Sequence, residues 1–228
     1  RKESSAASDV YKRQVMDILE IMKERHSVRQ YKNQAIESSK REKINALIKD
    51  VNAESKLSIQ VFYDEPKCFD SFMAHYGKFE NVKNYIAIVG NKNDQEKAGY
   101  YGEKIVLKCQ KLGLNTCWVA MTHGKSKAQI KRGQKLLIII SLGYGETQGV
   151  PHKSKSIAEL GQADQKNEWF EKGMEAVSLA PTAVNQQKFY FELKNGIVTA
   201  KNLGGFYSRI DLGIVKYHFE AVTGHEVK

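Results

Sequence analysis

The sequence predicts an α+β fold in which a layered sheet is flanked by helices and one helix is buried at the centre. Segments with a helical period and segments rich in β-branched residues interleave along the 228 residues, without the strict alternation of a doubly wound sheet. No GxGxxG pattern follows the first expected strand, which argues against a Rossmann fold. The last helical segment, 208–223, is apolar nearly all round, as expected of a helix buried centrally or at a subunit interface.

The N-terminal half alternates between helical and extended patterns. The clearest helix covers 38–54, where Ser38 or Ser39 can cap the first turn and apolar residues recur at i, i+3, i+4 and i+7. A later helix is expected to stop at Gly113. The expected elements of this half are helices over 15–24, 38–54 and 95–112, and strands over 57–63, 84–90 and 115–120.

The C-terminal half begins with a strand over 135–143 that contains the longest apolar run of the chain, Leu136 to Ile140. A polar stretch to Gln165 is expected to lack regular structure. A helix over 167–179 is stopped by Pro181, and two short strands flank the turn signal Asn195-Gly196. The buried helix over 208–223 completes the fold, so 15–228 is expected to form one domain.

Composition indicates a soluble protein, and we expect it in the cytoplasm. No apolar run approaches the roughly 18 residues of a membrane span, and three separated cysteines without a CxxC pair indicate neither disulfides nor a zinc cluster. The formal net charge of +10 is dispersed along the chain. We expect no metal site at the histidines either, since their spacing is wrong and no carboxylate stands beside His218 or His225 in a position to complete one.

Residues 1–14 are set apart from the fold. The string Asp9-Val10-Tyr11-Lys12-Arg13-Gln14 resembles the translation of a transposon end used in preparing sequencing libraries. We interpret 1–14 as a scar of that kind or a disordered tail, and either interpretation leaves the segment unstructured.

Three short segments carry residue types suited to binding a heterocyclic phosphate. The segment 24–31 crowds two arginines and a serine, whose donors match a phosphate group. The segment 111–120 places small residues where a backbone can approach a flat ring, and 179–189 offers amides that can read the edge of a heterocycle. Each segment alone has a structural alternative: a solvated basic loop, a helix-to-strand turn with a core cysteine and tryptophan, and a helix-terminating loop.

Together these segments resemble the nitroreductase family of flavoproteins. Arg25-His26-Ser27-Val28-Arg29 matches the family's opening Arg-[Arg/His]-Ser-x-[Arg/Lys] signature, Leu112 to Trp118 is similar to its LGLGTCW segment, and Ala180 to Gln187 is similar to its APSAxNxQ segment. The position of the third motif in the C-terminal half, with 209–214 after it, is similar to a divergent branch. Asn115 and Gln186-Gln187-Lys188 depart from the family pattern, and they bear on the ring-face turn and the ring-edge loop.

The resemblance implies a nitroreductase-like sheet and a bound flavin mononucleotide (FMN). Arg25, Ser27 and Arg29 would hold the phosphate and ribityl chain, and we expect both arginines to be exposed and to lie on one face. The loop around Asn185 and Gln187 would contact the ribityl chain or ring edge, and the strand after Gly113 would offer backbone contacts near the ring. The cofactor-binding residues implied are Arg25, His26, Ser27, Arg29, Thr116, Cys117, Pro181, Thr182, Ala183, Asn185 and Gln187.

The activity implied is an NAD(P)H-dependent oxidoreductase that passes two electrons to a nitroaromatic, quinone or similar conjugated acceptor. We nominate no catalytic side chain, because the flavin carries the hydride chemistry and Cys117 has no basic neighbour in sequence to activate it. A small-molecule acceptor is the expected partner, a homodimer stays open, and we expect neither a membrane nor nucleic acid. The alternative is a non-catalytic flavin-binding or basic nucleic-acid-associated protein, motivated by the charge of +10.

Overall fold

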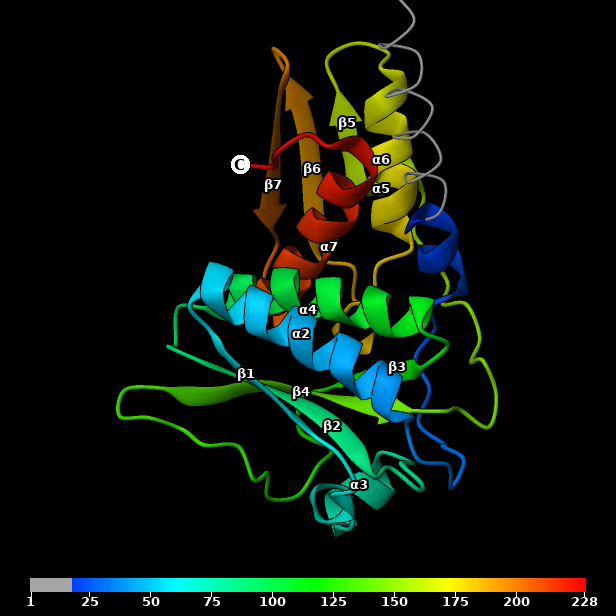
Figure 1. The fold of residues 1–228 in the computed structure, drawn as a ribbon. Coiled ribbons are helices and arrows are strands. Elements are labelled where there is room, and N and C mark those ends of the chain that lie inside the picture. The colour runs from blue at the N-terminus through cyan, green and yellow to red at the C-terminus, as the bar shows by residue number, and fades with distance from the viewer. Residues whose placement is uncertain (1–17) are drawn as a thin grey trace, which may run out of the picture.

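Two sheets and the helices between them build the α+β fold, which confirms the predicted class (Figure 1). The computed structural model describes residues 18–228. The larger sheet is antiparallel, with the order β1-β2-β4-β3, and the smaller has the order β5-β6-β7. Their strands are β1 (Ser58–Phe62), β2 (Asn84–Gly90), β3 (Asn115–Val119), β4 (Lys135–Gly143), β5 (Gly161–Ala163), β6 (Phe189–Lys194) and β7 (Ile197–Asn202).

Helices fill the space between the two sheets. α2 (Ser38–Ser55) and α4 (Gln95–Lys111) lie across one face of the larger sheet, and α7 (Ser208–Thr223) lies between α4 and the smaller sheet (Figure 1). α6 (Glu168–Ser178) packs along α7. The apolar sequence of α7 is explained by this central position, because its neighbours cover it on several sides.

The opposite face of the larger sheet is covered by short elements. η1 (Pro66–Cys68) and α3 (Phe72–Tyr76) follow β1, and a second apolar cluster around Tyr31, Phe69 and Tyr85 packs here. Residues 18–24 are helical and pack on the other side, against α4, α6 and α7. The remaining short elements are α5 (Ile157–Leu160) and η2 (Ala183–Asn185). The sheet is therefore buried on both faces, which accounts for the complete burial of β2.

The expected boundaries of β2, β4 and α7 are confirmed to the residue. The expected cap of α2 is wrong, because the helix begins at Ser38 after Glu37, and no side chain caps its first turn. The polar stretch before Gln165 holds α5 and β5, which the sequence pattern missed. The interpretation of residues 1–14, and the first residues of the helix expected over 15–24, lie outside the described residues.

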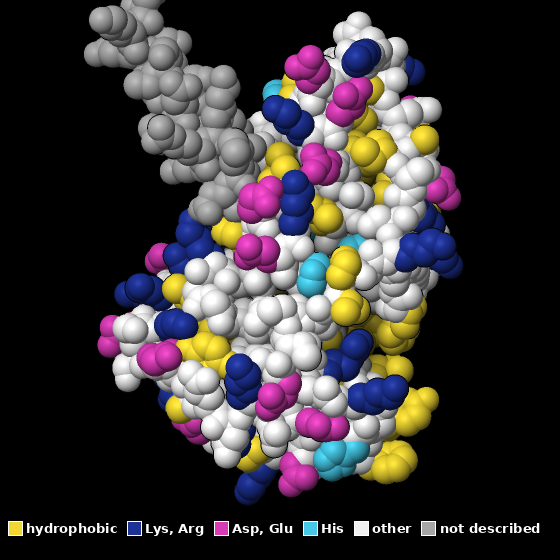
Figure 2. Space-filling view, turned by 90° about the vertical axis from the view of Figure 1, so that its right-hand side faces the viewer, with side chains coloured by type: hydrophobic (Ala, Val, Ile, Leu, Met, Phe, Trp, Pro, Cys, Tyr) yellow, Lys and Arg dark blue, Asp and Glu magenta, His cyan; other side chains and the backbone are white. Residues whose placement is uncertain are grey.

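The surface carries both signs of charge in mixture. On the face in Figure 2, lysine and arginine side chains alternate with aspartate and glutamate and gather in no single patch. In the part of the chain from residue 18 onward, no helix has the length and apolar character to cross a membrane.

Candidate functional site

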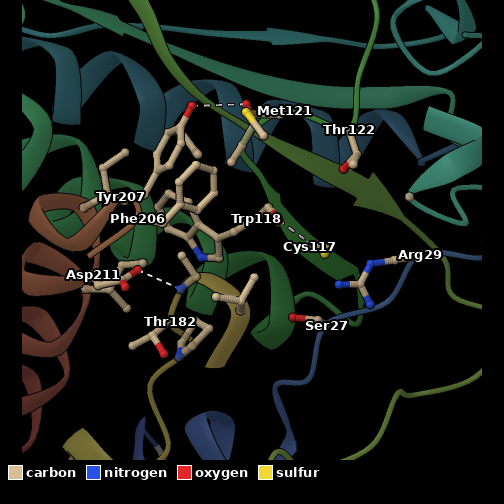
Figure 3. Close-up of a pocket in the computed structure, with 18 of the residues that line it drawn as sticks. Ser27, Arg29, Cys117, Trp118, Met121, Thr122, Thr182, Phe206, Tyr207 and Asp211 are labelled. Atoms are coloured by element: carbon tan, nitrogen blue, oxygen red, sulfur yellow. Dashed lines mark hydrogen bonds between the residues drawn. The ribbon is translucent and has the colours of Figure 1, made fainter. Parts of the chain in front are cut away.

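A cavity of about 480 Å³ lies where the larger sheet, α7 and two loops meet (Figure 3). Its walls come from six separate stretches of the chain, so the fold is needed to assemble it. Arg29 and Ser27 lie at one end, and Trp118, Phe206 and Tyr207 at the other. The lining residues are Ser27, Arg29, Tyr76, Gly77, Lys78, Cys117, Trp118, Ala120, Met121, Thr122, Ile138, Pro181, Thr182, Ala183, Val184, Phe206, Tyr207, Ile210, Asp211 and Ile214.

The arginine motif reaches the cavity by adding to the edge of the larger sheet. Ser27 forms a parallel bridge with Thr116 of β3, and the Val28 backbone N–H donates to the Thr116 carbonyl at 3.0 Å. This pairing holds Ser27 and Arg29 exposed on the cavity wall, with Val28 buried between them. The Arg29 guanidinium lies 5.9 Å from the centre of the Phe79 ring, which limits its orientation.

Arg25 does not share this environment, contrary to the expectation of two exposed arginines on one face. Its side chain is only 2% exposed and its Nε lies 3.9 Å from the Glu103 carboxylate of α4. Nε and Nη1 of Arg25 are buried with no hydrogen-bond partner. The difference follows from where the pairing with β3 begins. Arg25 directly follows the helical residues 18–24 and is buried there, whereas the segment joins β3 only from Ser27 onward. His26 beside it is half-buried and does not line the cavity, and burial followed by the charge of Arg25 lowers its pKa.

β3 presents Cys117 and Trp118 to the cavity. Thr116 is absent from the cavity lining, and its carbonyl already accepts the Val28 N–H. Burial raises the pKa of the Cys117 thiol, although the charge of Arg29 acts in the opposite direction. The thiol therefore stays protonated near neutral pH.

The loop after α6 divides the remaining expected residues into two groups. Pro181, Thr182 and Ala183 line the cavity. Asn185 and Gln187 instead bind the segment before α5: the Asn185 amide donates to the Lys153 carbonyl at 2.9 Å, and Gln187 Oε1 accepts the Lys155 N–H at 2.8 Å.

Backbone strain accompanies this loop. Val184 has a φ of +47°, a left-handed conformation that β-branched residues rarely adopt, and its side chain is 85% exposed at the cavity.

Asp211, near the start of α7, is a cavity residue that the sequence reasoning missed. Its Oδ1 accepts the Ala183 N–H at 2.9 Å, and its Oδ2 accepts from the Gln186 amide at 2.7 Å. Gln186 also donates to the Phe206 carbonyl at 2.6 Å, so this carboxylate fixes both loops at this end of the cavity. Burial raises the pKa of Asp211 to about 6, against the two hydrogen bonds.

Most of the other missed lining residues come from segments without a motif. Tyr76 ends α3, Lys78 follows it, and Phe206 and Tyr207 precede α7. A sequence signal existed for Trp118 and Val184, inside the second and third motifs, and for the segment similar to the divergent branch, which holds Ile210, Asp211 and Ile214. Among the residues that the structure describes, no group of three His, Cys, Asp or Glu side chains is placed to hold a metal ion.

Comparison with known proteins places this cavity in a recognised fold. A structure from Thermotoga maritima, described as a "putative nitroreductase", superposes with a TM-score of 0.66 at 24% identity and covers 90% of this chain and 82% of its own. A "putative nitroreductase in complex with FMN" from Desulfovibrio desulfuricans has a TM-score of 0.50 at 15% identity, and covers 62% of this chain and 93% of its own.

A third structure, a "putative NADH dehydrogenase/NAD(P)H nitroreductase" from Bacteroides thetaiotaomicron, has a TM-score of 0.50 at 19% identity, and covers 66% of this chain and 98% of its own. No curated protein matches the sequence. The family model described as "Putative TM nitroreductase" matches residues 17–223, which confirms the family resemblance predicted from the sequence. Because that match spans most of its length, the chain belongs to this nitroreductase family.

Proposed function

We propose that the chain is an FMN-dependent oxidoreductase that takes electrons from NADH or NADPH and passes two of them to a nitroaromatic, quinone or similar conjugated acceptor. The observation that carries this proposal is the single cavity that joins Arg29 and Ser27, Cys117 and Trp118, and Pro181 to Ala183. These residues come from the three motif segments, which are far apart in sequence. Family membership and the FMN in the Desulfovibrio structure's description support the same proposal.

The chemistry of the cavity fits a planar ring that carries a phosphate. Arg29 and Ser27 supply a cation and a hydroxyl donor at one end, and Trp118 and Phe206 supply apolar surface at the other. Arg25 itself does not line the cavity, but it stands two residues before Ser27, and its buried Nε and Nη1 have no hydrogen-bond partner. Buried donors without an acceptor are costly, and a nearby anion would compensate them.

Each wall then has a role toward the flavin. Arg29 and Ser27 would hold the phosphate, with the positive charge of Arg25 behind them, and the Thr182 and Ala183 segment would contact the ring. FMN, when bound, supplies the hydride chemistry, so the protein has to bind, orient and exclude water. Asn185 and Gln187 would act indirectly, by holding the loop in place through Lys153 and Lys155.

The mouth of the cavity favours a flat, apolar acceptor. Apolar side chains from four segments surround it and remain exposed: Tyr76 at 74%, Met121 at 57%, Val184 at 85% and Phe206 at 44%. Exposed apolar groups gathered around one opening mark a binding surface. Lys78 is the cation that stands among them, suited to the phosphates of a pyridine nucleotide.

The test is the absorbance spectrum of the purified chain loaded with FMN. Anaerobic addition of NADH or NADPH should bleach the oxidised flavin bands, and a nitroaromatic or quinone should restore them. If neither pyridine nucleotide reduces the bound flavin, the oxidoreductase proposal is wrong. A chain that binds no FMN but binds DNA with a steep salt dependence would support the nucleic-acid alternative instead.

A further inference from the structure

A cluster of ionisable side chains lies behind the cavity wall, in the interior between three elements. Arg25, Glu103 of α4 and His218 of α7 are 2%, 0% and 0% exposed. Glu103 lies 115 residues from His218 in the sequence, and the fold brings the two side chains together. Burying charged groups costs several kcal/mol each unless they are paired and hydrogen-bonded, so a buried cluster beside a cavity calls for a functional explanation.

Glu103 is the centre of this cluster and links it to the cavity. Its Oε2 accepts the indole N–H of Trp118 at 2.9 Å, and its Oε1 lies 3.0 Å from His218 Nε2. Trp118 lines the cavity, so its indole is fixed by a bond on the side away from the ligand space. α4 leaves room for the indole because Gly102 has no side chain. A Cβ at this position would lie only 2.4 Å from Trp118 Cη2.

The partners of His218 define its protonation. Nδ1 lies 2.8 Å from the Ala176 carbonyl, which can only accept, and Nε2 faces the Glu103 carboxylate. A ring that carries hydrogen on both nitrogens, an imidazolium, donates to both of these acceptors. Burial raises the pKa of Glu103, but the hydrogen bond from His218 and the charges of His218 and Arg25 outweigh it and lower that pKa. The pair is thus ionic.

We propose that Glu103 is a positioning residue which, held in place by the imidazolium of His218, fixes the Trp118 indole as one wall of the cavity. A neutral carboxyl or amide at this position could not accept from the indole and the imidazolium equally well. A ring with hydrogen on only one nitrogen would leave either the Ala176 carbonyl or Oε1 of Glu103 without a donor from His218. The orientation of a cavity wall is therefore linked to a proton held on α7.

The charged and titratable groups around His218 come from each neighbouring element. Glu103 faces it from α4, Arg25 from the segment after the helical residues 18–24, and His152 from the stretch before α5. Tyr217 stands next to it in α7. Glu103 is the anion among them, so its removal would leave the positive charges of Arg25 and His218 uncompensated.

Nitrogen NMR on the chain without flavin tests the inference directly. The chain has two tryptophans, so its spectrum should show two indole N–H signals, which Trp118→Phe assigns. We expect both nitrogens of His218 to carry hydrogen at neutral pH and the Trp118 N–H to exchange slowly with solvent. Trp169 is the internal reference, since its ring stacks on His225 at 3.9 Å and takes no part in the cluster. A neutral His218 ring would overturn the inference.

The variant Glu103→Gln tests the link to the cavity. We expect its Trp118 N–H signal to move and to exchange faster with solvent. Its Kd for FMN should rise roughly tenfold, because the charged hydrogen bond that holds the indole wall in place is weakened. His225→Gln is the matched control and should change neither. An unchanged Trp118 signal in folded Glu103→Gln would overturn the inference, and if this variant does not fold, the wild-type His218 measurement decides alone.

The FMN readout rests on the proposed function, whereas the two NMR readouts on the flavin-free chain do not. If the wild-type chain binds no FMN, the proposed function is wrong. The NMR spectra of the flavin-free chain would still decide whether Glu103 positions Trp118.

Discussion

At the scale of single residues, two arginines four positions apart lie in different environments. Arg29 is exposed on the cavity wall, whereas Arg25 is buried against Glu103 with two unpartnered donors. An exposed guanidinium adds little to stability, while removal of one member of a buried ion pair costs about 3 kcal/mol. The two positions should therefore respond differently to the same substitution.

For Arg29→Ala we expect FMN affinity to fall about ten- to hundredfold, because a hydrogen bond to a charged group contributes roughly 1.5 to 3 kcal/mol. Riboflavin, which lacks the phosphate, should lose little, and the melting temperature should stay close to wild type. Arg25→Ala should weaken FMN binding and also lower stability. Titrating both ligands into the flavin-free variants checks this, and equal losses for riboflavin and FMN would place Arg29 away from the phosphate.

Asp211 should make stability depend on pH in the acid range. Its carboxyl has a pKa of about 6 in the fold against an ordinary value of 3.8, so between these values the folded state binds more protons than the unfolded state. Stability therefore falls as pH rises through this window, by about 3 kcal/mol in total. Asp211→Asn should lack this fall, and Asp50→Asn, at an exposed position of α2, should keep it. Urea unfolding from about pH 4 to pH 7 measures it, and parallel wild-type and Asp211→Asn curves would contradict it.

Predicted residues lie in the cavity lining where a motif falls on a strand or loop that reaches the cavity, as for Ser27, Cys117 and Thr182. The sequence could not separate Arg25 from Arg29, because spacing alone does not tell which way a segment turns before it pairs. Glu103 was equally hidden: on its own helix it resembles any charged residue, and only the packing of α4 against α7 brings it to His218. Residues that act through a partner far away in sequence leave no local pattern.

At the scale of elements, the crossing of α4 and α7 is the tightest helix contact at the cavity. A Cβ at Gly99 would lie 2.0 Å from the Ile210 carbonyl oxygen, and one at Gly213 would lie 1.9 Å from the Glu96 carbonyl oxygen. The two glycines thus face the partner's backbone, and the helices approach closely because neither has a side chain there. This contact fixes the start of α7, with Ile210 and Asp211, against the sheet.

Gly213→Ala should therefore destabilise the fold by about 3 kcal/mol, the upper part of the range for overpacking, because a backbone carbonyl cannot move aside as a side chain can. Lys97→Ala, on the exposed side of α4, is the control and should change stability by less than about 0.5 kcal/mol. Chemical unfolding of the three proteins gives the comparison. A Gly213→Ala variant as stable as wild type would show that the helices can separate without cost.

Long periodic elements and strands marked by a turn signal were predictable, whereas the shortest elements were not. α4 and α7 were read from one apolar face or an apolar sequence, since such patterns persist over several turns. α5 and β5 together cover only residues 157–163 and depend on pairing with β6, so their sequence carries no repeating signal. The predicted cap of α2 was wrong because a capping residue must precede the first helical residue. The helix begins at Ser38, so both serines lie inside it and neither can cap it.

At the scale of the whole molecule, the cavity-lining residues in the described part of the chain all lie between Ser27 and Ile214. Deleting residues 1–14 should leave the melting temperature and the flavin content within error, because that segment has no apolar period with which to pack. Thermal unfolding and the flavin absorbance of the shortened protein test this. A large drop in melting temperature would show that the tail packs against the fold.

The central position of α7 also determines the order in which the molecule can be completed. During synthesis the ribosome releases the larger sheet and α4 well before residues 208–223. The face of α4 around Gly99, which α7 covers in the complete fold, is therefore exposed until α7 has been made. Until then the cavity lacks the wall formed by Ile210, Asp211 and Ile214. Nascent chains that stop short of α7 should carry all three motifs and still retain no ligand, so ligand capture should begin only after α7 has been made.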